Sequence, residues 1–171
     1  DRLVLEEARE IDVVICDKTG TLTEGRFGVV ELATVDGWSE KRALALAAAI
    51  EGDSEHLIAR GIRRQAEERE VAAVRVDDFE AIQGRGIRAT HDGRTVYVGG
   101  PRLLEMLGSE LPEGLDRFTD DAGDKGQSVV YLVDDGEPVA AFALADVIRP
   151  ESHQAVKRLR ELGVEVAMLT G

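Results

Sequence analysis

The sequence has few of the features that mark secreted, membrane-spanning or nucleic-acid-binding chains. It contains a single cysteine, Cys16, which excludes an intramolecular disulfide and suits a reducing compartment. Its longest apolar runs, residues 43–50 and 139–145, are far shorter than the roughly 20 residues that span a bilayer, so no transmembrane segment is expected. Basic residues are outnumbered, 21 against 34 acidic ones, and the net charge of −13 disfavours nucleic acid and anionic membrane surfaces as general partners.

Aromatic residues are also scarce, at 4% of the chain, although 43% of its residues are hydrophobic. A core must therefore be built mainly from Val, Leu, Ile and Ala. The length of 171 residues permits one large domain or two small ones. We expect a soluble, globular chain without internal repeats or low-complexity tracts.

Apolar periodicity and turn residues predict a succession of short elements. Ser39 is the expected N-cap of the second predicted helix. The expected helices are residues 1–10, 39–50, 54–69, 101–107 and 150–162, and the expected strands are 13–16, 27–35, 74–76, 79–82, 86–90, 94–98, 128–133, 139–144 and 164–169. Asp92-Gly93 predicts a tight hairpin turn. The stretch 108–126, rich in Asp, Glu and Gly, is predicted to be a loop.

This order predicts a discontinuous base that carries an inserted domain. A buried strand near the start and a helix-strand unit at the end are parallel α/β pieces, whereas the middle is α+β, with an antiparallel sheet flanked by a helical hairpin. The expected divisions are residues 1–30 for the first part of the base, 31–146 for the insert and 147–171 for the second part.

The stretch Asp17-Lys18-Thr19-Gly20-Thr21-Leu22-Thr23 comes directly after the apolar run 13–16. In open α/β sheets ligands bind at the carboxyl ends of such strands, so Asp17 is placed to act as a nucleophile. Gly20 permits a tight turn, and the three threonines offer hydroxyls and amides for phosphate oxygens. The alternative is a polar turn without chemistry, because Asp, Gly and Thr are ordinary turn residues.

This ordered string resembles the phosphorylation motif of P-type ATPases. The resemblance implies a haloacid-dehalogenase-like Rossmannoid base, incomplete in this chain, and a catalytic group of Asp17, Lys18 and Thr19. In that family the aspartate accepts the γ-phosphate of ATP, and Mg²⁺ is bound at the positions of Asp17 and Thr19. Related phosphatases carry a second Asp where this chain has Thr19, which cannot act as an acid or base, so a longer-lived phosphoenzyme is expected.

A second group of residues resembles the ATP-binding pattern of the heavy-metal branch of that family. It comprises Glu51, Ser54-Glu55-His56 and Gly84-Arg85-Gly86. The resemblance makes Glu51 an acceptor for the adenine amino group and places the ring of His56 near the base, while Gly84 and Gly86 allow close backbone approach. Two departures stand out: Leu57 replaces the family's proline, and Gly99-Gly100 replaces Gly-Asn, although both glycines can still give backbone contact.

The closing segment adds a third match. Residues 146–150 resemble the hinge of the family, with Asp146 and Arg149 as its polar residues, and Arg149 is expected to meet either a phosphate or Asp146. Thr170-Gly171 resembles the start of the phosphate-holding Thr-Gly-Asp motif, which makes Thr170 a further catalytic candidate. The family's later lysine and its remaining Mg²⁺ ligands are expected beyond Gly171.

Together these resemblances imply the ATP-binding cytosolic portion of a heavy-metal-transporting P-type ATPase, with copper favoured over zinc, cadmium or cobalt. The implied cofactors are ATP and Mg²⁺. The implied partners are the transmembrane and actuator domains of a longer parent chain at the cytoplasmic face of a membrane, and the transported metal ion, with no nucleic acid. A soluble aspartate-nucleophile phosphatase with a cap domain, and a non-catalytic nucleotide-binding module, remain as alternatives.

Overall fold

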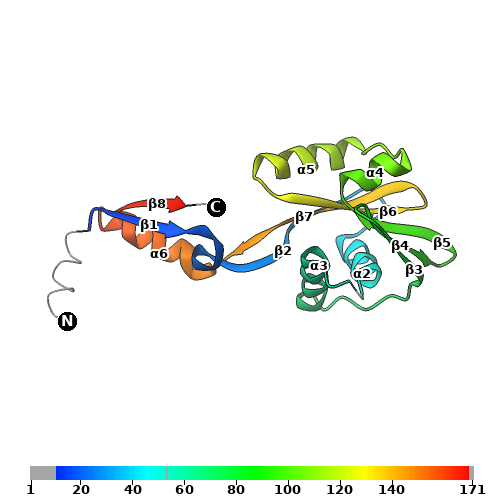
Figure 1. Cartoon of the computed structure of the whole chain (residues 1–171), viewed down its shortest axis with the longest axis horizontal. Coiled ribbons are helices and arrows are strands. Elements are labelled where there is room, and N and C mark those ends of the chain that lie inside the picture. Colours follow the sequence, from blue (N-terminus) through cyan, green and yellow to red (C-terminus); the bar gives the residue numbers. More distant parts are fainter. Residues whose placement is uncertain (1–10, 53, 170–171) are drawn as a thin grey trace. The chain divides into compact units, whose positions relative to one another are not determined.

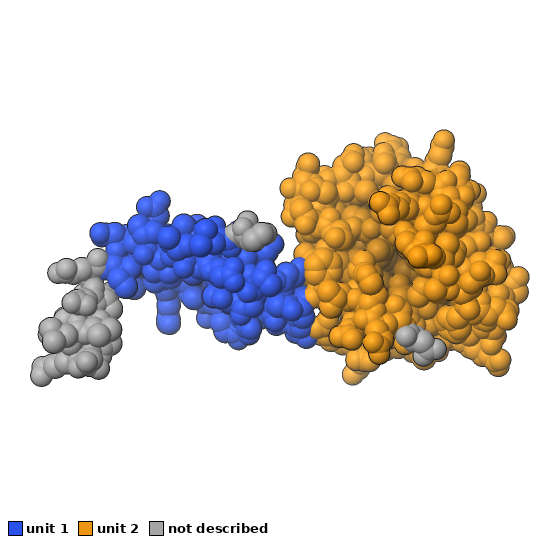
Figure 2. Space-filling model, viewed as in Figure 1, with its two compact units in different colours: residues 1–26, 146–171 blue, residues 27–145 orange. Residues whose placement is uncertain are grey.

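The computed structural model describes residues 11–52 and 54–169. The helix predicted over residues 1–10 and the catalytic candidate Thr170 lie outside the described residues. The chain divides into two compact units (Figure 2): unit 1 runs to Arg26 and resumes at Asp146, and unit 2 is the continuous stretch Phe27–Ala145.

Unit 1 is built on a parallel pair of strands, β1 (Val13–Asp17) and β8 (Glu165–Leu169). Their register pairs Val13 with Glu165 and Asp17 with Leu169, so both strands end at the same edge. The segment η2 (Lys18–Leu22) follows β1, and helix α6 (Pro150–Glu161) precedes β8 (Figure 1). Pro150 stands in the first turn of α6, where its missing N–H needs no partner.

The two strands of unit 1 form as predicted, but the prediction that they are buried is wrong. Val13, Ile15, Met168 and Leu169 are 46%, 61%, 54% and 63% exposed. In the described part of unit 1 a single helix accompanies a two-stranded sheet, and one helix cannot cover both faces. Apolar composition alone did not reveal this.

Unit 2 contains a six-stranded sheet in the order β2-β7-β6-β5-β4-β3. The pairings from β3 to β7 are all antiparallel. Its strands are β2 (Thr23–Thr34), β3 (Asp77–Ile82), β4 (Gly86–His91), β5 (Arg94–Gly99), β6 (Ser128–Asp134) and β7 (Glu137–Ile148). The first residues of β2 and the last of β7 belong to unit 1, so these strands carry the chain between the units.

Helices cover both faces of this sheet (Figure 1). α2 (Glu40–Ile50) and α3 (Leu57–Glu68) share one hydrophobic core with the sheet, which includes Leu44, Ile62 and Phe142. α4 (Pro101–Leu107) and α5 (Glu113–Asp124) share a second core, which includes Leu103, Leu115 and Tyr131. The insert is thus a three-layer unit with mainly aliphatic cores on both sides of its sheet.

Most predicted elements are present, and Ser39 caps α2 by accepting a hydrogen bond from the backbone N–H of Arg42. The predicted loop 108–126 is wrong, because residues 113–124 form α5. Its only buried side chains are Leu115 and Ala122, two turns apart on one face, which is a weak signal among acidic residues and glycines. The strand predicted over 74–76 is also wrong: that segment has no regular structure, yet Val74 and Val76 pack against the first core.

Candidate functional site

Asp17 is the last residue of β1 and is exposed at the carboxyl end of the strand, as predicted. The next residues leave the strand through η2, whose torsions are not helical throughout. Gly20 has φ +80°, a left-handed conformation that side chains disfavour. Lys18 and Thr19 therefore lie in the turn that directly follows the candidate nucleophile Asp17. The conformation of Gly20 allows this turn to close.

Thr23 closes this turn from inside. Its hydroxyl is 2.5 Å from Asp146 Oδ2 and 3.0 Å from the carbonyl oxygen of Lys18, and it accepts a hydrogen bond from the N–H of Gly20 at 3.1 Å. The residue is only 2% exposed. The expectation that the Thr23 hydroxyl serves phosphate oxygens is therefore wrong: that hydroxyl is committed to the turn and to Asp146.

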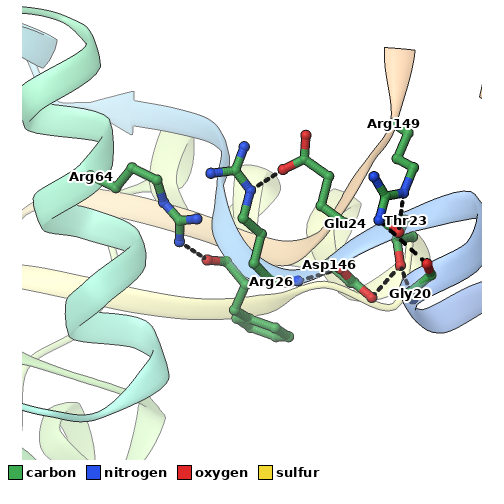
Figure 3. Close-up of polar contacts among 8 residues, drawn as sticks. Gly20, Thr23, Glu24, Arg26, Arg64, Asp146 and Arg149 are labelled. Carbon is green, nitrogen blue, oxygen red and sulfur yellow. Dashed lines mark hydrogen bonds and ion pairs between the residues drawn. The ribbon is translucent and has the colours of Figure 1, made fainter. Parts of the chain in front are cut away.

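Asp146 and Arg149 brace the turn from the returning segment (Figure 3). Besides contacting Thr23, Asp146 accepts a hydrogen bond from the backbone N–H of Arg26 at 3.0 Å. Arg149 donates from Nε to the carbonyl of Thr23 at 2.9 Å and from Nη2 to that of Gly20 at 3.4 Å. Its backbone N–H also donates to the carbonyl of Leu22 at 3.0 Å. Arg149 was expected to meet either a phosphate or Asp146. The contacts that its side chain makes are instead with backbone carbonyls.

A second cluster lies where α2 ends and α3 begins. Glu51 is the C-cap residue of α2 and is 7% exposed. Burial raises the pKa of its carboxyl above the ordinary value, while a hydrogen bond with Ser54 and the charges of His56 and Arg63 act in the opposite direction. A buried carboxyl group beside a helix junction is an unusual placement that needs a polar partner.

His56 is the N-cap residue of α3. Its Nδ1 accepts a hydrogen bond from the N–H of Ile58 at 3.4 Å, so in the neutral ring the hydrogen belongs on Nε2. The side chain is exposed. The ring is thus held by one nitrogen and offers the other to a ligand.

The glycines differ in their structural reasons. Gly86 and Gly99 are directly opposite each other in the β4–β5 pair, and a Cβ on either would lie 2.1 Å from a backbone carbonyl oxygen. Gly84, by contrast, has φ +70° and open space where its Cβ would be. Gly100 is the N-cap residue of α4 and, as a glycine, has no side chain with which to cap the helix. Close approach of two strands thus explains Gly86 and Gly99, and the left-handed φ explains Gly84, without a ligand in either case.

The predicted residues therefore fall into two groups. Asp17, Lys18 and Thr19 are in unit 1 with the Asp146–Arg149 brace, and Glu51 and His56 are in unit 2. Gly84, Gly86, Gly99 and Gly100 are also in unit 2; Ile87, next to Gly86, packs on the same core as Ile50 and Ile58, which are close in sequence to Glu51 and His56.

Three polar residues were not singled out from the sequence for the contacts they make: Arg26, Arg63 and Arg64. Arg63 contacts the carbonyls of Glu51 and Ser54. Figure 3 shows the other two: Arg26 provides the backbone N–H held by Asp146, and Arg64 donates to the carbonyl of Phe27 at 2.8 Å. Arg26 uses its own backbone N–H, and Arg63 and Arg64 use their guanidinium groups to contact backbone carbonyls. Contacts that involve backbone atoms leave no sequence motif.

The residues fit the implied cofactors to different degrees. Glu51, a buried carboxyl group, and His56, an exposed ring with a free nitrogen, suit an uncharged ring with amino groups, such as adenine. Across residues 11–52 and 54–169, no cluster of three metal-ligating His, Cys, Asp or Glu side chains is present. Mg²⁺ bound to a nucleotide commonly uses only one or two carboxylates together with phosphate oxygens and water, so Asp17 suits one such ligand position.

Within the described part of the chain, none of the helices has the length and apolarity required to cross a membrane.

Comparison with known proteins places the chain in a family. The chain is 40% identical over 171 residues to a copper-exporting P-type ATPase B of Archaeoglobus fulgidus, of which it covers 24%. Its structure resembles that of a zinc-transporting PIB-type ATPase, with a TM-score of 0.80 and 31% identity over 97% of this chain and 26% of that one. It also resembles the catalytic domain of the CPx-ATPase CopB-B, solved in a study of nucleotide binding, with a TM-score of 0.57 and 28% identity over 96% of this chain and 56% of that one.

The chain thus spans about a quarter of the length of the curated relative that it matches. A profile of the haloacid dehalogenase-like hydrolases matches residues 11–171, which include Asp17 at the end of the parallel strand β1. The chain belongs to the haloacid dehalogenase-like hydrolase family.

Proposed function

We propose that this chain is the ATP-binding portion of a heavy-metal-transporting P-type ATPase, with copper as the transported ion. The observation that carries the proposal is the order of its parts: an aspartate at the end of a parallel strand, a separate unit with Glu51 and His56, and a return to that strand's neighbour. The 40% identity to a copper-exporting ATPase, along the whole of this chain, supports the choice of ion.

In this proposal residues 1–30 and 147–171 are parts of the phosphorylation domain, and residues 31–146 are the nucleotide-binding domain. The parent chain would supply transmembrane and actuator domains and would place this portion at the cytoplasmic face of a membrane. The transported ion would bind to residues that this chain does not contain.

The reaction assigned to Asp17 is phosphoryl transfer. One carboxylate oxygen of Asp17 forms a bond to the γ-phosphorus of ATP, the bond from that phosphorus to the bridging oxygen breaks, and ADP leaves with the bond's electron pair. Lys18 supplies positive charge next to the acceptor, and the N–H groups of η2 other than that of Gly20, which donates to Thr23, orient phosphate oxygens. Asp17 and Thr19 would be among the ligands of Mg²⁺, which when bound would neutralise part of the phosphate charge.

Thr19 also affects the lifetime of the phosphorylated enzyme. Its hydroxyl is a poor general base, so the aspartyl phosphate lacks the group that would activate water two residues after the nucleophile. Slow hydrolysis gives a phosphoenzyme enough lifetime to couple to another event, such as ion movement.

Binding of ATP is assigned to unit 2, with the adenine amino group donating to Glu51 and the ring of His56 beside the base. Replacing Glu51 with Ala removes that acceptor and should weaken ATP binding by about 5- to 150-fold, the cost of leaving one polar partner unpaired. Calorimetric titration of ATP into the 171-residue chain measures this. Glu110→Ala, at an exposed position between α4 and α5, is the matched control and should bind ATP normally.

Equal ATP affinity for the Glu51→Ala and Glu110→Ala chains would reject the role of Glu51, and failure of the unsubstituted chain to bind ATP would reject the proposed function. A soluble phosphatase is the second candidate, because the matching family is one of hydrolases. Turnover of a generic phosphomonoester that Asp17→Asn abolishes would favour that candidate.

A further inference from the structure

Arg63 occupies an unusual position behind the Glu51–His56 cluster. It lies on α3, two helical turns after His56, and is half-buried. Its Nη1 donates to the carbonyl of Glu51 and, at 2.8 Å, to the carbonyl of Ser54. One guanidinium nitrogen therefore holds both ends of the short connection from Glu51 to Ser54.

The same connection carries the local hydrogen bonds that lead to His56. The N–H of Ser54 donates to the carbonyl of Glu51 at 3.1 Å, and the Ser54 hydroxyl accepts from the N–H of His56 at 3.4 Å. Glu51 caps the C-terminus of α2, where free carbonyls carry partial negative charge and a cation is favourable. Arg63 thus stabilises the backbone from which both candidate nucleotide-binding side chains project.

Leu57 makes this support more important. The family that this chain resembles has a proline after the histidine, and that proline would fix the first turn of the helix. This chain has Leu57 there, whose side chain is 61% exposed. His56 nevertheless has φ −62° and ψ 146°, the extended conformation that a residue before proline adopts. The backbone at His56 thus already has the conformation that a following proline favours, and in this chain the His56 cap and the contacts of Arg63 stabilise the junction instead.

We infer that Arg63 is a positioning residue for the nucleotide: it holds the carbonyls of Glu51 and Ser54 and so orients the Glu51 carboxylate and the His56 ring, without touching the ligand. This inference depends on the proposed ATP site. It extends that site to a side chain behind the junction and explains how the junction keeps its shape without proline.

The test is a set of ATP titrations on the 171-residue chain. Arg63→Met keeps most of the aliphatic stem but removes the donors, and should weaken ATP binding about tenfold. Arg64→Met is the matched control, because it removes the same charge and a backbone contact from the next residue of α3, but its contact is with Phe27, and its ATP affinity should be unchanged. Arg63→Lys keeps a charged donor and should recover part of the affinity.

Rescue gives the readout that general destabilisation would not produce. Adding Leu57→Pro to Arg63→Met should restore part of the ATP affinity, because proline favours the extended conformation of His56, one of the two residues that Arg63 orients. If circular dichroism shows that the Arg63→Met chain does not fold, the comparison of Arg63→Lys with and without Leu57→Pro decides in its place.

Normal ATP affinity in the folded Arg63→Met chain would overturn the inference, as would equal losses in the Arg63→Met and Arg64→Met chains, or no gain from Leu57→Pro. These results differ from the failure of the proposed function, in which the unsubstituted chain itself would not bind ATP.

Discussion

The Gly84-Arg85-Gly86 turn offers a sharp test, since its two glycines are required for different reasons. Alanine at position 86 would place a Cβ 2.1 Å from the carbonyl oxygen of Val98 and 2.8 Å from the Cα of Gly99. Both atoms are backbone atoms of the paired strand β5, so only separation of β4 from β5 relieves the overlap. Alanine at position 84 would meet no atom within 4 Å.

The cost of each substitution depends on these surroundings. At Gly86, φ is +147°, a conformation that costs a side-chain-bearing residue about 1 to 3 kcal/mol, and the overlap adds about 1 to 3 kcal/mol of overpacking. Gly86→Ala should therefore lower the free energy of unfolding by about 2 to 6 kcal/mol. At Gly84, φ is +70° in open space, so Gly84→Ala should cost only about 1 kcal/mol, after the lower entropy of the unfolded chain is counted.

Urea denaturation followed by tryptophan fluorescence measures both values. Trp38 is the only tryptophan of the chain, and it packs against the core shared by α2, α3 and the sheet, so it reports on unit 2. If Gly86→Ala is no less stable than Gly84→Ala, the close approach of β4 and β5 is not the reason for glycine at position 86. ATP titration of the same pair adds a second readout: Gly84→Ala should stay folded and, if the backbone at Gly84 lies against ATP as the proposed function requires, bind ATP less tightly.

Three further predictions concern the pH dependence caused by Glu51, the first turn of α3 at Leu57, and the contacts of Asp146 with Thr23 and Arg26. Burial raises the pKa of Glu51 above 4.5, so the folded chain binds this proton more tightly than the unfolded chain. The free energy of unfolding should therefore fall as pH rises from about 4.5 through the raised pKa, and urea titrations across pH should show that Glu51→Gln removes this component. Leu57→Pro should add about 0.4 to 1 kcal/mol of stability, seen as a higher Tm, since the conformation of His56 already suits a following proline. Asp146→Ala should cost about 1 to 3 kcal/mol and speed hydrogen exchange at the Arg26 amide, because it removes the acceptor for that N–H and for the Thr23 hydroxyl. Unchanged exchange at Arg26 would contradict the brace.

Local sequence signals predicted much of the fold. The Asp92-Gly93 pair predicted a hairpin turn, and both residues have the positive φ that a tight hairpin turn requires. Ser39 was predictable as a cap because its partner lies three residues away. Helix α5 was not predictable in this way, since tertiary packing of Leu115 and Ala122 outweighs the weak local preference of a segment rich in Asp and Gly.

The candidate site likewise has features that local sequence predicts and features that it does not. Asp17 was predictable because the transition from apolar to polar residues marks the end of a strand, and the structure puts it there. The contact between Thr23 and Asp146 was not, because 123 residues separate the two and a threonine hydroxyl has many possible partners. Arg63 escaped notice for a related reason: it contacts backbone carbonyls, and those carry no residue identity in the sequence.

The parallel pairing of β1 with β8 has a consequence for biosynthesis. During synthesis β1 is made before unit 2, but its partner β8 is made only after the whole of unit 2. Unit 2 is continuous and rich in short antiparallel hairpins such as β4–β5 and β6–β7, so it can fold while β1 still waits. A nascent chain therefore presents the apolar residues Val13 and Ile15 without their partner strand β8 throughout synthesis of the insert, and during this interval β1 is a target for chaperone binding.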